Sequence, residues 1–440
     1  MNLSRIKRWI LLGHRWLGIG TCLLFFLWFL SGVVMMYVGH PKLTWQERLE
    51  HLPPLEASQP LLSPADAFQQ AGIQGTVTDL RLANARAGQP VYIAQIRPDA
   101  RPAPDAPRPE PRLLALDART GTLLPPTDPA TALASAQVYL EQGGLSHPSS
   151  SSTLPASGPR QPSTAPGAPG KPLYQGITVE DAHTHSAAMD LHRPLHKVLL
   201  PDADQTLLYI SGTTGEVVRD APRLERGFNY LGAWLHWLYL FRDTAIDWTD
   251  LIIWLSVIGT VATLSGFLAG IIRWRFSRPY RSGSRSPFAP GALRWHHILG
   301  LVFALTTFTW IFSGLMSMNP WDIFEADESI IDARRISNPD IQPSRAIATP
   351  QALLASTTTP VRELQWHTLL DKARVKAIRT HDVPPGSADQ PVLLSARTGK
   401  PYNLEPERLR SALFTLQAGY PPRIDILRQD DFYYYSRTEH

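Results

Sequence analysis

Three long apolar segments alternate with polar, proline-rich segments along this chain. The apolar segments at 9–37, 248–272 and 298–318 each hold about 20 or more nearly uncharged residues, enough to cross roughly 30 Å of hydrocarbon. The pattern therefore predicts three transmembrane helices. The first segment is too long for a signal-peptide core and no small-x-small cleavage motif follows it, so we expect a retained anchor.

The first and third apolar segments repeat one sequence without a gap. HRWLG, which starts at His14, aligns with HHILG, which starts at His296, so that Gly18 matches Gly300. Two histidines therefore enter two apolar helices at the same depth. The alignment predicts an internal tandem duplication.

The polar regions show a different periodicity. Alternating apolar residues around a Thr-Gly corner describe β-hairpins at 113–124, 207–218 and 392–401, because glycine accepts the positive φ of a tight turn. Short helices with proline in the second position are expected at 63–71 and 349–356. We therefore expect small α+β modules, each with one helix packed on a few antiparallel strands.

These signals together predict the organisation of the chain. Its parts are an N-terminus at 1–8, a first transmembrane helix at 9–37, an outer module at 38–227, an amphipathic interfacial segment at 228–247, a second transmembrane helix at 248–272, a basic loop at 273–295, a third transmembrane helix at 296–318 and a second outer module at 319–440. Stretches near 101–112 and 147–171 have few apolar side chains, so we expect disordered insertions there.

The second repeat is expected to be incomplete. It has no counterpart of the 207–218 hairpin and no fourth transmembrane helix before FYYYSRTEH. A truncated gene product and a naturally short form would both explain this difference.

Basic residues predict the orientation. They gather near the N-terminus and in the 273–295 loop, which contains no acidic residue. The positive-inside rule places both segments in the cytoplasm and the two modules outside. This asymmetry accounts for most of the net charge of +4, so nucleic-acid binding is not indicated. The single cysteine, Cys22, excludes a disulfide or a cysteine metal site within one chain.

Several of these motifs resemble the PepSY-associated transmembrane family. They are HRWLG at the start of a membrane helix, the D-x-x-T-G hairpin from Asp117, LHW before the return helix, and the basic loop. The resemblance implies an integral membrane α-helical protein of the bacterial inner membrane with periplasmic α+β PepSY-like modules. Four transmembrane helices are expected for a complete repeat, and three are seen.

The resemblance also implies a function. The family includes iron-uptake proteins and ferrisiderophore reductases, so we expect haem-mediated electron transfer to a ferric siderophore or other ferric chelate in the periplasm. The sequence contains no nucleophile-base arrangement, P-loop or dinucleotide fingerprint, and we assign no catalytic residue. Electrons would then come from a cytoplasmic or quinone donor. The alternative is a non-enzymatic PepSY scaffold or regulatory protein that binds a peptidase or transporter outside the membrane.

Two imidazoles on facing helices can ligate haem iron axially. Both repeats run outward, so a pseudo-twofold axis along the membrane normal would place His14 opposite His296 near the cytoplasmic face. We expect a haem b there, with His297 as a substitute ligand or propionate partner and with Arg15 and Arg294 at the level of the propionates. A histidine near a helix end also commonly faces lipid headgroups, and this interpretation stays open.

His236 is the candidate metal ligand for a second, outer haem. It lies between Trp234 and Trp237 in GAWLHWLYLF, where an amphipathic helix is expected to meet the membrane. Tryptophans gather at interfaces, so an incidental histidine in an aromatic belt explains the pattern equally well. The HRPLH run at 192–196 has the spacing of a helical metal site, but Pro194 argues against a helix there.

Overall fold

The computed structural model describes residues 3–97, 110–145, 170–242, 244, 247–324, 337–338, 340–379, 392–416 and 425. The chain forms two compact units, Met1–His40 with Glu225–Asp327, and Pro41–Leu224 with Glu328–His440. The expected insertions near 101–112 and 147–171 lie almost entirely outside the described residues, and so does the C-terminal FYYYSRTEH.

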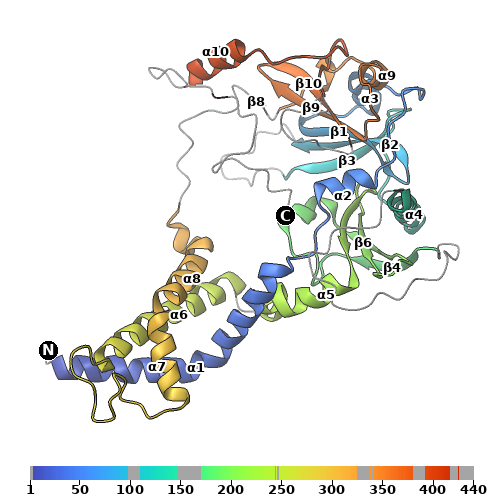
Figure 1. Ribbon diagram of the computed structural model, residues 1–440. Helices are drawn as coiled ribbons and strands as arrows, with labels where there is room; N and C mark the ends of the chain where they lie inside the picture. Colours follow the sequence, from blue (N-terminus) through green and yellow to red (C-terminus); the bar gives the residue numbers. More distant parts are fainter. Residues whose placement is uncertain are drawn as a thin grey trace. The chain divides into compact units, whose positions relative to one another are not determined.

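The first unit consists of membrane helices (Figure 1). Two helices of the described chain are long and apolar enough to cross a bilayer. They are α1 (Leu3–Tyr37) and α6 (Trp248–Arg273), with mean hydropathies of 2.2 and 2.1 over their most apolar windows. These helices confirm the first two predicted spans, although α1 begins earlier than expected.

The third apolar segment is bent. We predicted one helix over 296–318, whereas the structure has α7 (Ala292–Val302) and α8 (Ala304–Ser317), inclined by 66°. The break falls at Phe303, whose φ of −98° and ψ of 4° leave the helical region. No proline marks this position, so the apolar pattern does not reveal the break.

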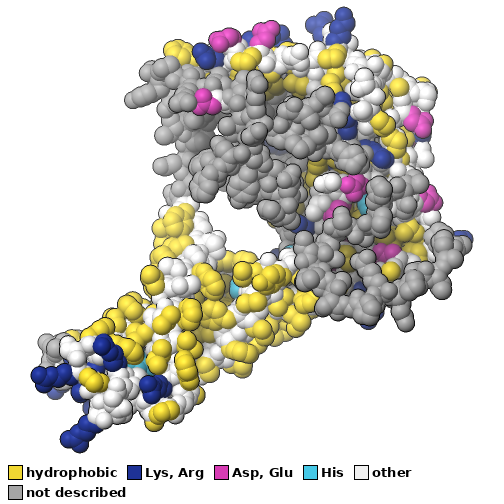
Figure 2. All heavy atoms as spheres, viewed as in Figure 1, with side chains coloured by type: hydrophobic (Ala, Val, Ile, Leu, Met, Phe, Trp, Pro, Cys, Tyr) yellow, Lys and Arg dark blue, Asp and Glu magenta, His cyan; other side chains and the backbone are white. Residues whose placement is uncertain are grey.

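Outward-facing apolar side chains identify the lipid-exposed side of α1. Trp16, Ile19, Leu23, Phe26 and Leu30 are all exposed and recur every three or four residues. This is the periodicity of one helix face, and an apolar face of this kind suits hydrocarbon. Figure 2 shows the same unit largely covered by hydrophobic side chains, with lysines and arginines gathered at one end.

Small residues bring α6 close to its neighbours. An added Cβ on Gly259 would lie 3.0 Å from Phe25 of α1, and one on Gly270 would lie 2.7 Å from Leu301 of α7. Glycines on membrane helices permit such close approach of helix backbones. Helix α6 therefore packs against α1 and against the α7–α8 pair.

The predicted interfacial segment at 228–247 is not one regular helix. It contains the end of α5 (Arg223–Asn229), a π-helical turn η2 (Tyr230–Trp234) and a short η3 (Tyr239–Phe241). The π-helical turn packs against α1, where an added Cβ on Gly232 would lie 3.2 Å from Met35.

The second unit contains two antiparallel sheets. The larger has the order β11-β10-β9-β1-β2-β3, and β8 pairs with β9. Its strands are β1 (Thr76–Arg86), β2 (Gln89–Arg97), β3 (Arg112–Asp117), β8 (Ser337–Asn338), β9 (Glu363–Leu369), β10 (Lys372–Ile378) and β11 (Val392–Ser395). Leu82 of β1 lies opposite Leu364 of β9, so strands from the two expected modules form one sheet. Leu80, Tyr92 and Trp366 are fully or almost fully buried in its core.

Local signals in this sheet match the predictions. The predicted helices are confirmed as α3 (Pro64–Ala71) and α9 (Pro350–Leu354), and the side chains of Ser63 and Thr349 accept a backbone N–H at their starts. The hairpin corners of 113–124 and 392–401 are also confirmed. Gly121 and Gly399 have φ of +69° and +72°, and an added Cβ on either would lie 3.1 Å from a backbone carbonyl of the adjacent helix.

The smaller sheet has the order β4-β5-β6-β7. Its strands are β4 (Leu173–Thr178), β5 (Leu195–Leu199), β6 (Leu207–Ser211) and β7 (Val217–Ala221), so β6 and β7 confirm the 207–218 hairpin. Helix α4 (Pro129–Leu145) packs its alanines against this sheet. The remaining short elements are α2 (Trp45–Glu50), η1 (Ala187–His192), η4 (Pro320–Asp322), η6 (Pro343–Arg345) and α10 (Pro406–Leu416).

The HRPLH run does not form a helical metal site. His192 ends η1, whereas His196 lies in β5, where Thr127 and Tyr174 are within hydrogen-bond distance of its two ring nitrogens. Within the described ranges, no group of three or more His, Cys, Asp or Glu side chains is arranged to hold a metal ion. The end of η1 at His192 and the start of β5 at Leu195 confirm the expectation against a helix at Pro194.

Candidate functional site

His14 of α1 lies directly against α6. Its Nδ1 is 3.2 Å from the carbonyl oxygen of Ala262, and an added Cβ on Gly266 would approach its Cε1 to 2.6 Å. A carbonyl oxygen can only accept a hydrogen bond, so this contact assigns the ring proton to Nδ1 and leaves the lone pair on Nε2. Histidine metal ligands commonly have this arrangement, with a backbone carbonyl accepting the other ring N–H.

His296 of α7 faces His14. The ring centroids are 6.3 Å apart and the ring planes are inclined by 18°. Imidazole nitrogens lie about 2 Å from a bound transition metal, so two axial imidazoles on one iron have centroids about 6 Å apart. The observed separation of 6.3 Å between the nearly parallel rings is therefore close to the value for two imidazoles that share one metal ion.

Glycines leave open space near both histidines. Gly18 and Gly300 each lie one helical turn after a histidine, and an added Cβ at either glycine would meet nothing within 4 Å. Residues i and i+4 share a helix face, so each imidazole adjoins open space on its own helix. These residues fit a flat macrocycle ligated by the two histidines.

The structure gives His297 a different position from His296. His297 is buried, with Nδ1 2.8 Å from the Ser286 hydroxyl and Nε2 3.0 Å from the carbonyl oxygen of Gly270. Its ring also packs edge-on against Trp274 and Phe288. Both nitrogens have partners, so His297 is better placed to hold the adjoining loop than to bind a metal.

Arg15 and Arg294 lie close in sequence to the paired histidines. Arg15 is exposed and lies 5.8 Å from the ring centroid of Trp16, whereas Arg294 is partly buried in the first turn of α7. Neither arginine forms an ion pair within the part of the chain that the structure describes. Both guanidinium groups are thus free to meet an anionic group near the histidines.

His236 lies near the opposite end of α1. Its Nδ1 is 3.1 Å from the hydroxyl of Ser31, and its ring lies beside Trp28 and Trp237. Ser31 follows His14 by 17 residues, so the two histidine positions are about 25 Å apart along the helix. Gly32, next to Ser31, lets the His236 ring approach α1 closely, because an added Cβ there would lie 3.5 Å from His236 Cε1.

The family model described as PepSY-associated TM region matches residues 11–416. The chain belongs to the PepSY-associated TM family. The matched range includes all six of the candidate residues discussed above. Neither a curated protein nor a solved structure matches the chain. Family membership and the two long apolar helices establish that this is a membrane protein.

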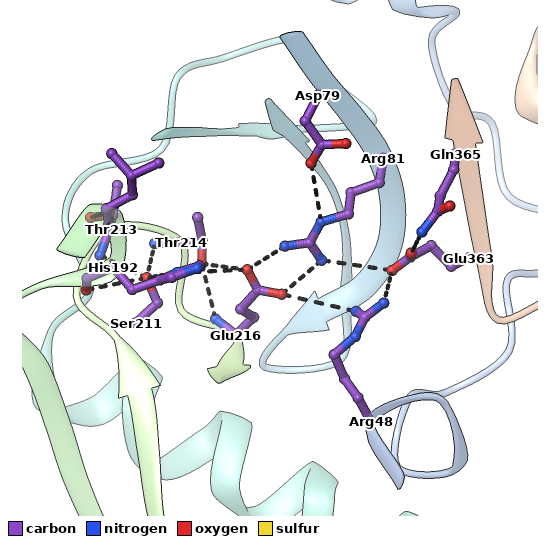
Figure 3. Close-up of polar contacts among 11 residues, drawn as sticks. Arg48, Asp79, Arg81, His192, Ser211, Thr213, Thr214, Glu216, Glu363 and Gln365 are labelled. Carbon is purple, nitrogen blue, oxygen red and sulfur yellow. Dashed lines mark hydrogen bonds and ion pairs between the residues drawn. The ribbon is translucent and has the colours of Figure 1, made fainter. Parts of the chain in front are cut away.

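The two-sheet unit of this PepSY-associated protein contains a cluster of charged side chains that no sequence motif predicted (Figure 3). Arg81 of β1 donates two hydrogen bonds to Glu216, of 2.6 and 2.8 Å. Arg48 of α2 donates one of 2.7 Å to Glu363 of β9, which also lies 3.6 Å from Arg81. The two carboxylates are almost fully buried. The cluster therefore joins the larger sheet to the corner between β6 and β7.

The charges in this cluster stabilise one another. Burial alone would raise the pKa of Glu216, but the adjacent charge and hydrogen bonds of Arg81 lower it to about 2. Burial also opposes the charge on Arg81, yet Glu216 and Glu363 raise the pKa of its guanidinium. Burial lowers the pKa of His192, which lies 3.9 Å from Glu216. At neutral pH Arg81 and Glu216 stay charged and paired, which indicates a structural role.

A small cavity adjoins the cluster. Arg48, Asn84, Tyr139 and Glu216 are among its lining residues. Its volume of about 20 Å³ suits a single water molecule. A ferric chelate is far too large for this cavity.

Proposed function

We propose that this PepSY-associated protein carries electrons across the bacterial inner membrane and reduces a ferric siderophore or other ferric chelate in the periplasm. The observation that carries the proposal is the pairing of His14 and His296 at a centroid separation of 6.3 Å. His14 is half-buried and His296 is exposed, and two imidazoles that face each other from membrane helices suit a haem b, which supplies one-electron redox chemistry when bound.

Histidine, arginine and glycine residues of the chain would each contribute to the binding of this haem. His14 would offer Nε2, because its Nδ1–H donates a hydrogen bond to the Ala262 carbonyl. His296 of α7 would offer the second ligand nitrogen, and Arg15 and Arg294 would pair with the propionates. Gly18 and Gly300 leave room beside the imidazoles. His297 keeps its hydrogen bonds to Ser286 and Gly270.

The proposed topology has three crossings. The bent pair α7–α8 forms the third crossing and the repeat-related partner of α1. The basic N-terminus and the 273–295 loop then face the cytoplasm by the positive-inside rule. Electrons enter from a cytoplasmic or quinone donor near His14 and His296, and leave on the periplasmic side. His236 is the proposed ligand of a second haem on that side.

Ferric iron gains one electron in the proposed reaction and becomes ferrous iron. Siderophores bind ferrous iron weakly, so the reduction releases the metal from its chelator. The chain contributes no nucleophile or general base to this reaction, since an electron is the only particle transferred.

The alternative function is a scaffold or regulatory protein. One observation favours it, namely that the two-sheet unit is joined by buried ion pairs around a cavity of only about 20 Å³. A unit of this kind suits contact with a peptidase or transporter through its surface.

Visible spectroscopy of the full chain distinguishes the two functions. After expression with added haem, the purified protein should show a Soret band and, on dithionite reduction, sharp α and β bands of six-coordinate haem b. His14→Ala and His296→Ala should each lose this signal, whereas His367→Ala, an exposed histidine of β9, should keep it. A colourless wild-type protein after haem loading would reject the reductase and favour the scaffold.

A further inference from the structure

The loop between α6 and α7 has a defined fold. The backbone N–H of Arg275 donates to the carbonyl of Arg285, and that of Tyr280 donates to the carbonyl of Ser284. Gly283 turns the chain with a φ of +75°, and its N–H donates back to Tyr280. These bonds close a hairpin-like turn with four exposed arginines, Arg275, Arg278, Arg281 and Arg285. These arginines belong to the basic loop at 273–295.

His297 anchors the basic loop to the helices. Through Ser286 it holds the loop, and through the carbonyl of Gly270 it holds the end of α6. Phe288 packs against the His297 ring and lies 5.4 Å below the guanidinium of Arg273. The arginines are therefore presented on a preformed surface, so less conformational entropy is lost when a ligand binds.

The charge of the basic loop is not neutralised by the protein nearby. No Asp or Glu occurs between Asp250 and Asp322 in the sequence. Across the described part of the chain, none of the loop arginines forms an ion pair. Arg275 stacks on Tyr280 at 4.2 Å, and one Arg285 nitrogen donates to the Phe276 carbonyl. The other guanidinium donors stay available for phosphate oxygens, which they match in a bidentate geometry.

Apolar side chains flank these arginines. Phe276, Leu293 and Trp295 are 62%, 66% and 62% exposed. Aromatic and basic residues together at a helix end are typical of the headgroup level of a bilayer. A soluble acidic protein would satisfy the arginines and leave three large apolar side chains in water, whereas a lipid surface accommodates both.

We propose that the basic loop is a preformed binding surface for anionic phospholipids. The arginines contact the headgroup phosphates, and Phe276, Leu293 and Trp295 enter the adjoining acyl region. The loop arginines are in this way ligands for lipid as well as determinants of topology. The proposal does not depend on haem binding or on reductase activity.

Lipid selectivity of the full chain in vesicles tests the proposal. Spin-labelled phosphatidylglycerol or phosphatidylcholine is added at trace level to phosphatidylcholine vesicles that contain the protein, and the motion-restricted fraction of each label is measured. The wild type should prefer phosphatidylglycerol. Arginines near a membrane surface typically each contribute about fivefold at low salt, so Arg278→Gln with Arg281→Gln should remove most of the preference.

Matched variants separate the loop from general charge effects. Arg397→Gln with Arg410→Gln removes the same charge from exposed positions of the other unit and should leave the selectivity unchanged. Ser286→Ala should weaken the selectivity and make the loop easier to cleave with trypsin, because it loses the bond to His297.

Either of two lipid results would overturn the proposal. The wild type could restrict phosphatidylglycerol and phosphatidylcholine equally, or Arg278→Gln with Arg281→Gln could leave the preference for phosphatidylglycerol intact. Loop-dependent binding of soluble polyglutamate without any lipid selectivity would also overturn it, because it would assign the arginines to an acidic protein partner.

Discussion

Nδ1 of His14 in α1 lies 3.2 Å from the carbonyl oxygen of Ala262 in α6, although the two residues are 248 positions apart in the sequence. The contact sets which ring nitrogen carries the proton, and so directs the free lone pair of Nε2 away from α6. The glycine at 266, one turn further along α6, is what makes the contact possible.

We therefore predict that Gly266→Ala disturbs the histidine pair. The new Cβ would lie 2.6 Å from His14 Cε1, so the ring must move and lose its bond to Ala262. Haem content per protein, measured by the pyridine haemochrome spectrum, should fall severalfold. Gly20→Ala is the matched control, because its Cβ would meet nothing within 4 Å and haem content should not change. Equal haem content in both variants would contradict the assigned role of the contact.

Arg81→Met should strongly destabilise the two-sheet unit. The substitution removes both hydrogen bonds from Arg81 to the buried Glu216 and leaves Arg48 as the remaining cation beside Glu216 and Glu363. Breaking a buried pair typically costs about 3–5 kcal/mol. Thermal unfolding of the full chain in detergent, followed by near-ultraviolet circular dichroism, should show a lower midpoint. Arg97→Gln breaks an exposed pair with Asp340 and should change stability by less than about 1 kcal/mol.

A glycine pair separates backbone strain from a steric clash. Gly121→Ala should destabilise the protein more than Gly72→Ala, although both glycines have positive φ. At Gly72 the added Cβ meets nothing within 4 Å, so alanine costs only roughly 1–2 kcal/mol of backbone strain. At Gly121 it would also lie 3.1 Å from the Ala67 carbonyl and 2.8 Å from Gln70. Equal thermal midpoints for the two variants would show that helix α3 moves away from the added Cβ at position 121 without a measurable loss of stability.

Local features of the fold were predictable because each rests on a few adjacent residues. Ser63 and Thr349 before a proline predicted two helix starts, and Thr-Gly corners predicted the turns at Gly121 and Gly399. The pairing of Leu82 with Leu364 was not predictable, because alternation within a strand does not identify its partner. The same applies to the Arg48–Glu363 hydrogen bond, whose members are 315 residues apart.

For the candidate site, the repeat distinguished His296 from His297, and the structure gives these neighbours different surroundings. His296 faces His14, whereas His297 turns inward to Ser286 and Gly270. The sequence contained no signal for the Ser286 contact, since a serine in a basic loop has many other uses. The bend at Phe303 was also missed, because the apolar run continues through this position without a proline.

The pH dependence of stability should report on Glu216. Arg81 lowers the folded-state pKa of Glu216 to about 2, from an ordinary value of 4.5. A carboxylate with a depressed folded pKa stabilises the protein above its unfolded pKa, and this stabilisation is lost as the pH falls through the folded value. The thermal midpoint of the full chain should therefore fall between about pH 4.5 and pH 2. Glu216→Gln should lower the midpoint at pH 7 and flatten its decline in this window, because the amide does not titrate. The control is Glu407→Gln on α10, whose carboxylate is largely exposed, and this variant should keep the wild-type profile. A decline of unchanged steepness in Glu216→Gln would show that another carboxylate governs the acid sensitivity.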